Sequence, residues 1–238
     1  MPDSETLTIK VFADGADVDA MLRLAADPRI AGFTTNPTLM RQCGVSDYER
    51  FARTALDHIS DRPISFEVFS DELDEMERQA HRIASWGPNV YVKVPITNTR
   101  GEDATKLVSR LTGDGVKLNV TAILSLRQVR SATEALESTA GAIVSVFAGR
   151  VADTGRDPVP LMSAALELVR EEAAAELLWA SPREILNVVQ ADAIGCHIVT
   201  VTNDLLKKLQ GLGHGLEDVS LDTVKMFRDD AVRAGFTL

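Results

Sequence analysis

Short apolar runs rich in β-branched residues alternate with longer amphipathic stretches along the whole chain. The runs have the length and composition of buried strands, and the stretches repeat their apolar positions with the helical period. The expected strands are Leu7–Ala13, Ala31–Thr35, Pro63–Phe69, Val90–Ile96, Lys117–Ile123, Ala142–Phe147, Glu176–Ala180 and His197–Val201. The clearest helical patterns are Asp17–Ala26, Asp47–His58, Glu72–Ser85, Ser125–Ser138 and Val159–Glu172.

This alternation is typical of a parallel sheet whose strands are joined by helices. Eight such units can close on themselves into a barrel. An open doubly wound sheet shows the same alternation, so only the number of units favours the barrel. We predict one α/β domain over residues 1–238, a (β/α)8 TIM barrel with an extra C-terminal helix at about 221–234.

Two helix starts carry recognisable caps. Ser125 is followed three positions later by Gln128, as a capping box requires. Ser181 precedes Pro182, which predicts a cap residue followed by proline in the first helical position.

Composition and charge narrow the class of protein. The formal net charge of −10 argues against a nucleic-acid partner, because phosphate backbones are met by clustered Lys and Arg. The first residues lack the apolar core of a secretory signal, and no apolar run approaches the roughly 20 residues of a membrane helix. Only Cys43 and Cys196 are present, which fits a reducing compartment. We expect a cytoplasmic protein without a membrane partner.

Polar residues interrupt the expected strands at positions that share one face. Because side chains alternate between the two faces of a strand, the valines around Lys93 point outward and Lys93 points into the barrel. The same alternation directs a further set inward near the carboxyl ends of the strands: Asp14, Glu67, Asn119, Thr121, Ser145 and Phe147. Barrel enzymes place their chemistry at that pole.

Each of these residues also has a structural interpretation. Lys93 and Glu67 could form a buried ion pair that serves only the fold, and Asn119 and Thr121 could be hydrogen-bonding core residues. Several strands nevertheless direct polar groups to one pole, where a purely structural polar centre would carry a large desolvation cost. Their convergence favours a functional site.

The residue types point to carbonyl chemistry. The inward set contains no His and no group of three metal ligands, and the chain has no Gly-rich nucleotide loop, so we expect neither a metal nor another cofactor. An amine in a weakly solvated pocket is favoured in its neutral form and condenses with a ketone to an iminium. A neighbouring carboxylate can relay the protons.

Four segments resemble the transaldolase family, which includes the small fructose-6-phosphate aldolases. The segments are Thr34-Thr35-Asn36-Pro37-Thr38, Val92-Lys93-Val94-Pro95-Ile96-Thr97, Leu118-Asn119-Val120-Thr121 and Ser145-Val146-Phe147-Ala148-Gly149-Arg150. The resemblance covers essentially the whole chain, in order. It implies a (β/α)8 barrel that acts on sugar phosphates in carbohydrate metabolism, as in the pentose phosphate pathway.

Matching motif positions imply the catalytic roles. Lys93 would form the Schiff base with the dihydroxyacetone part of a ketose phosphate. Glu67 and Thr121 would hold the water that shuttles protons. Asp14 would act on the hydroxyl whose deprotonation breaks the carbon–carbon bond.

The same resemblance implies the binding residues. The residues that would contact substrate are Thr35, Asn36, Asn119, Ser145, Phe147 and, at the phosphate, Arg150. Dedicated aldolases of the family carry Tyr where Phe147 stands, whereas transaldolases carry Phe, so transfer is favoured over simple cleavage. The segment Trp179–Arg183 departs from the family by being short, and Arg183 is the candidate for a second phosphate cation.

Two alternatives remain besides transaldolase. One is an aldolase that releases free dihydroxyacetone, and the other is a barrel that binds a sugar phosphate without catalysis. A metal-dependent barrel enzyme is less favoured than either. The small family members form rings through a C-terminal tail, which is consistent with a homo-oligomer.

Overall fold

The computed structural model describes residues 7–136, 141–170 and 175–237. Within them the strands form a closed parallel barrel in sequence order. The strands are β1 (Lys10–Asp14), β2 (Ile30–Thr34), β3 (Ile64–Glu67), β4 (Val90–Pro95), β5 (Leu118–Ile123), β6 (Ala142–Val146), β7 (Ala175–Trp179) and β8 (Ile198–Thr202). The predicted TIM barrel and its eight strands are therefore confirmed.

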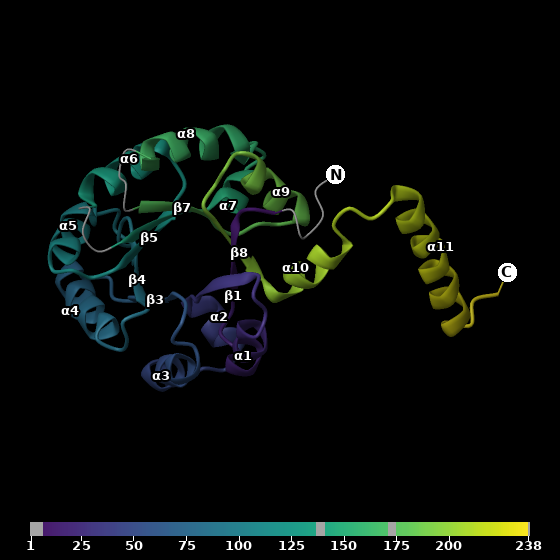
Figure 1. The fold of residues 1–238 in the computed structure, drawn as a ribbon, viewed down its shortest axis with the longest axis horizontal. Coiled ribbons are helices and arrows are strands. Elements are labelled where there is room, and N and C mark those ends of the chain that lie inside the picture. The colour runs from purple at the N-terminus through teal and green to yellow at the C-terminus, as the bar shows by residue number, and fades with distance from the viewer. Residues whose placement is uncertain (1–6, 137–140, 171–174, 238) are drawn as a thin grey trace.

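Helices lie around the outside of this barrel, except for the last one (Figure 1). In chain order, the helices of the described residues are α1 (Val18–Ala25), α2 (Pro37–Gln42), α3 (Tyr48–His58), α4 (Leu73–Ala84), α5 (Thr105–Gly113), α6 (Leu126–Ala135), α7 (Ala148–Ala152), α8 (Pro158–Arg170), α9 (Ile185–Ala193), α10 (Asn203–Lys208) and α11 (Leu216–Arg233). A short 3-10 helix, Leu209–Gly211, follows α10. The expected ends of the Ser125–Ser138 and Val159–Glu172 helices lie outside the described residues.

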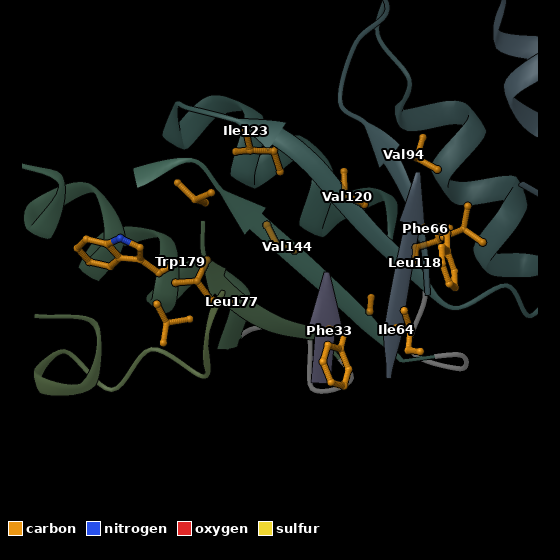
Figure 2. Packing of buried hydrophobic residues seen from close by; sticks show 14 of the residues in the cluster. Phe33, Ile64, Phe66, Val94, Leu118, Val120, Ile123, Val144, Leu177 and Trp179 are labelled. Atoms are coloured by element: carbon orange, nitrogen blue, oxygen red, sulfur yellow. The ribbon is translucent and has the colours of Figure 1, made fainter. Parts of the chain in front are cut away.

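Two apolar clusters hold the layers together. The larger one fills the space between the outer face of the strands and the helices, and Figure 2 shows members such as Val120, Val144 and Leu177 on neighbouring strands. The smaller one consists of inward side chains: Phe12, Ile143, Leu178, Ala180 and Ile198. Burial on both faces explains why the strands read as nearly continuous apolar runs.

The structure confirms one of the two predicted helix starts and contradicts the other. The Ser125–Gln128 capping box is present at the start of α6, as predicted. The predicted start at Ser181–Pro182 is wrong, because α9 begins at Ile185 with Glu184 as its N-cap. Ser181 instead has a φ of 59°, in the left-handed region, where no helix can begin.

The last helix, α11, stands apart from the barrel (Figure 1). It begins at Leu216 rather than at the predicted Leu221, because Gly215 is its N-cap and Glu217 and Asp218 favour its first turn. None of its residues is buried. Over the described part of the chain, no helix combines the length and apolarity needed to cross a bilayer.

Candidate active site

A cavity of about 450 Å³ opens at the carboxyl ends of the strands. Its walls contain most of the site residues predicted from the sequence: Asp14, Asn36, Glu67, Lys93, Thr121, Ser145, Phe147 and Arg150. Leu178 and Ala180 belong both to the cavity wall and to the inner apolar cluster, so this cluster contributes to the wall. The barrel thus brings residues from distant parts of the chain to one pole.

Lys93 lies at the centre of this site and is only 6% exposed. The parallel register places Glu67 of β3 beside it on one side and Asn119 of β5 on the other. Lys93 Nζ lies 3.0 Å from Glu67 Oε2 and donates a hydrogen bond of 2.9 Å to the backbone carbonyl of Thr35. The amine therefore has a proton acceptor within direct reach and a cavity in front of it.

Asp14 lies across the cavity at the end of a chain of hydroxyl groups. Thr34 Oγ1 donates to Asp14 Oδ1 at 2.8 Å and makes a short hydrogen bond with Thr200 Oγ1. Because the Thr34 proton goes to Asp14, the Thr200 hydroxyl must donate to Thr34. Burial raises the pKa of Asp14, while the charge of Lys93 and the Thr34 hydrogen bond oppose that rise and the charge of Glu67 adds to it.

A second polar network lies behind Lys93. Asn119 Nδ2 donates to Ser65 Oγ at 3.1 Å, and Ser145 Oγ donates to Asn119 Oδ1 at 2.7 Å. Asn119 is fully buried and does not line the cavity; it fixes Ser145, which does. This arrangement leaves the Ser145 oxygen free to accept a hydrogen bond from a ligand.

Thr121 presents a buried hydroxyl for which no partner is found within the described residues. Directly after it, β5 changes register against β6 and Ala122 adopts a φ of 60°. Bulges and left-handed residues of this kind cost free energy and concentrate beside active sites. Thr121 lines the cavity, and no described residue competes with a ligand or water for its hydroxyl.

The start of α2 forms another wall. The Asn36 side chain caps this helix, since Oδ1 accepts a hydrogen bond of 3.0 Å from the backbone N–H of Leu39, and Pro37 occupies the first helical position. With Oδ1 engaged in the cap, the amide nitrogen of Asn36 is the group that can donate into the cavity.

Arg150 adds a guanidinium to the cavity wall. It lies in α7, and its guanidinium is 5.4 Å from the centre of the Phe147 ring. The preceding Gly149 permits a close crossing of the chain, because a Cβ there would lie 1.5 Å from the carbonyl oxygen of Ser181. Gly149 N–H also donates to the carbonyl of Ala180.

Three residues predicted to bind substrate do not line the cavity: the buried Asn119 described above, Thr35 and Arg183. Thr35 is buried and donates its hydroxyl to the carbonyl of Ser65, so its neighbour Thr34 is the threonine that faces the cavity. Arg183 does not line the cavity and forms an ion pair with Asp153, with 3.0 Å between Nε and Oδ1.

Five polar wall residues were not assigned to the site from the sequence: Thr34, Thr38, Gln42, Ser181 and Thr200. Thr200 could have been found by extending the inward alternation to β8. Within residues 7–136, 141–170 and 175–237, no group of three His, Cys, Asp or Glu side chains is placed to hold a metal ion.

Comparison with known proteins agrees with this geometry. The model of a family described as "Transaldolase/Fructose-6-phosphate aldolase" matches residues 11–237. A "Probable transaldolase" of Dehalococcoides mccartyi is 32% identical over 212 residues, covering 88% of this chain and 93% of the relative. A "Probable transaldolase 2" of Listeria monocytogenes is 34% identical over 215 residues, covering 90% of this chain and 93% of the relative.

A third relative and one solved structure complete the comparison. A "Probable transaldolase" of a Thermoanaerobacter species is 32% identical over 232 residues, covering 97% of this chain and 100% of the relative. A crystal structure of mandelate oxidase aligns with a TM-score of 0.57 at 15% identity, covering 90% of this chain and 74% of that one, a likeness of fold alone. The chain belongs to the transaldolase/fructose-6-phosphate aldolase family.

Proposed function

We propose that this protein is a transaldolase that transfers a dihydroxyacetone unit between sugar phosphates through a Schiff base on Lys93. The observation that carries the proposal is the placement of Lys93: a buried amine that faces a cavity, with a carboxylate oxygen 3.0 Å away. The names of the relatives support the reaction class. Asp14 and Arg150 line the same cavity, which supports assigning cleavage to Asp14 and phosphate binding to Arg150.

Iminium formation requires a proton to leave the amine and a hydroxide equivalent to leave the ketone carbon. Glu67 accepts the proton from Lys93, which frees the nitrogen lone pair to attack the carbonyl carbon. After the attack, the nitrogen gives a second proton to the alkoxide oxygen, which makes the carbinolamine hydroxyl. The protonated Glu67 then returns its own proton to this hydroxyl, directly or through a water held by Thr121, and water leaves as the iminium forms. Lys93, Glu67 and Thr121 all line the same cavity.

Cleavage follows from the positive charge on the iminium nitrogen. Asp14 removes the proton of the hydroxyl carried by the far carbon of the bond that breaks. The oxygen of this hydroxyl becomes the carbonyl of the released aldehyde, and the electron pair of the broken bond moves into the iminium to form an enamine. An acceptor aldehyde then reacts by the same steps in reverse. Asn36 donates to the dihydroxyacetone unit and Ser145 accepts from it, while Arg150 binds the phosphate.

A class I aldolase that releases free dihydroxyacetone is the alternative within this chemistry. Phe147 lies in the cavity wall and has no hydroxyl that could assist protonation of the enamine by water. The enamine therefore survives to meet an aldehyde, which favours transfer. Measuring free dihydroxyacetone from fructose 6-phosphate with and without an acceptor aldehyde separates the two reactions.

Borohydride trapping tests the Schiff base directly. Wild-type protein incubated with fructose 6-phosphate and borohydride should gain a reduced three-carbon unit on the Lys93 peptide. Lys93→Ala should gain none, whereas Lys117→Ala, which changes a surface lysine of the neighbouring strand region, should be labelled like wild type. Unlabelled wild-type protein that still binds fructose 6-phosphate would instead support a non-catalytic sugar-phosphate-binding barrel.

We also propose that α11 packs against a second copy of the chain, making a homo-oligomer. Its large apolar side chains are exposed, among them Val224 at 61% and Phe227 at 63%. Exposed apolar surface of this extent marks an interaction site in a folded protein. Light scattering should give a mass above that of one chain, and Val224→Glu with Phe227→Glu should lower it; a monomeric wild type would contradict the proposal.

A further inference from the structure

The backbone carbonyl of Glu67 lies where the ladder between β2 and β3 ends. In that ladder, Phe33 N–H donates to the carbonyl of Pro63 and Thr35 N–H donates to the carbonyl of Ser65. The next donor in the same register would be residue 37, which is proline and has no N–H. The Glu67 carbonyl therefore lacks its strand partner.

Tyr48 supplies the missing hydrogen bond from outside the barrel. Its hydroxyl donates to the Glu67 carbonyl at 2.8 Å. Tyr48 is the first residue of α3, whose start is fixed by the Asp47 side chain accepting from Arg50 N–H at 3.0 Å. The Tyr48 hydroxyl thus gives the last carbonyl of β3 the hydrogen bond that a neighbouring strand would otherwise supply.

Aromatic neighbours hold the Tyr48 ring in position. The centres of the Phe66, Phe69 and Trp86 rings lie 6.4, 5.7 and 5.6 Å from that of Tyr48, all in edge-to-face geometry. Burial raises the pKa of the Tyr48 hydroxyl, so it remains a donor well above neutral pH. On the other side of β3, Val68 N–H donates to the Lys93 carbonyl at 3.0 Å.

We propose that Tyr48 is a positioning residue for the reaction: by capping the Glu67 carbonyl, it holds the Glu67 carboxylate against Lys93 Nζ. The proposal rests on the proposed Schiff-base function. Proton transfer is sensitive to displacements of about 0.5 Å, and the backbone of Glu67 is anchored to β4 by Val68 and to the β2 side by Tyr48. Loss of the Tyr48 anchor lets the carboxylate move away from the amine.

Tyr48→Phe removes the hydroxyl and keeps the ring with its aromatic neighbours. The rate of iminium formation is measured as the fraction trapped by borohydride over time after mixing with fructose 6-phosphate, together with kcat and KM. The rate of iminium formation and kcat should both fall about tenfold. This loss is a part of the ~10²–10⁴-fold rate enhancement that a positioned acid–base group contributes. KM should change by less than about twofold, since Tyr48 does not itself line the cavity.

Two further variants identify the route of the effect. In a Glu67→Gln background, Tyr48→Phe should cause no further loss, because the group it positions is already absent. Tyr91→Phe makes the same change at the other tyrosine, which lies at the amino-terminal pole of β4, and should react like wild type.

The outcomes separate this inference from the proposed function. If wild-type protein is never trapped, the Schiff-base function fails and the role of Tyr48 falls with it. If wild type is trapped and Tyr48→Phe is trapped equally fast, only the positioning role is refuted. A lower melting temperature with unchanged kcat, or an undiminished loss in the Glu67→Gln background, also overturns it.

Discussion

Replacing Gly149 by alanine should damage both the stability and the site of this protein. The added Cβ would lie 1.5 Å from the carbonyl oxygen and 2.6 Å from the carbonyl carbon of Ser181. Contacts of Cβ atoms below 3.0 Å essentially do not occur, so the Ser181 backbone must retreat by about 1.5 Å. This movement breaks the 3.3 Å hydrogen bond from Gly149 N–H to the Ala180 carbonyl.

The magnitude follows from these two effects. Overpacking costs about 1–3 kcal/mol, and the lost hydrogen bond costs about 1 kcal/mol. Together they predict a loss of about 2–4 kcal/mol in the free energy of unfolding, or roughly 4–16 °C in melting temperature for a chain of this size. Activity measured well below that temperature should also fall, because Arg150 and Ser181 both line the cavity.

Gly113→Ala is the matched control. Gly113 is the last residue of α5, and a Cβ there would meet nothing within 4 Å. Alanine at this helical position should leave the free energy of unfolding unchanged or raise it by up to about 1 kcal/mol. Thermal unfolding followed by circular dichroism compares the two variants. A Gly149→Ala protein with the melting temperature and the activity of wild type would refute the close crossing at Ser181.

Two pH-dependent predictions follow from other contacts. Thr34→Val removes the hydrogen bond that lowers the pKa of Asp14, so this pKa should rise further. Because Asp14 must be ionised to act as a base, the acid limb of kcat/KM for fructose 6-phosphate cleavage should move to higher pH; an unmoved limb would show that Asp14 is not the titrating base. Burial lowers the pKa of His197, whose Nδ1 accepts a hydrogen bond of 2.9 Å from Leu177 N–H. Below its ordinary pKa of about 6.5 the unfolded chain therefore binds more protons than the folded one, so stability is lost as pH falls. His197→Gln should reduce the drop in urea midpoint between pH 7.5 and 5.5, and an unchanged drop would contradict this role.

The amino-acid pattern predicts a large part of the candidate site because alternation in a strand is a local property. Once the strands were located, the inward direction of Glu67, Lys93 and Ser145 followed from the side-chain period of two. The structure places these three residues in the cavity wall. Their roles in the reaction remain predictions.

Alternation was less useful where a strand is irregular. The register between β1 and β2 shifts between Val11 and Phe12, and the two adjacent threonines after Phe33 cannot both face inward. The structure directs Thr34 into the cavity and Thr35 to the Ser65 carbonyl. The bulge in β5 after Val120, with its left-handed Ala122, carries no comparable signal in the sequence.

The sequence by itself determined the alternation of strands and helices, the inward polar set and the family motifs, because each depends on neighbouring residues along the chain. Only the tertiary structure decided which groups touch across the barrel. Thr34 and Thr200 lie 166 positions apart and meet because β1 closes the barrel between β2 and β8. The same holds for Tyr48 at the Glu67 carbonyl and Ser181 over Gly149, since packing of distant segments sets both contacts.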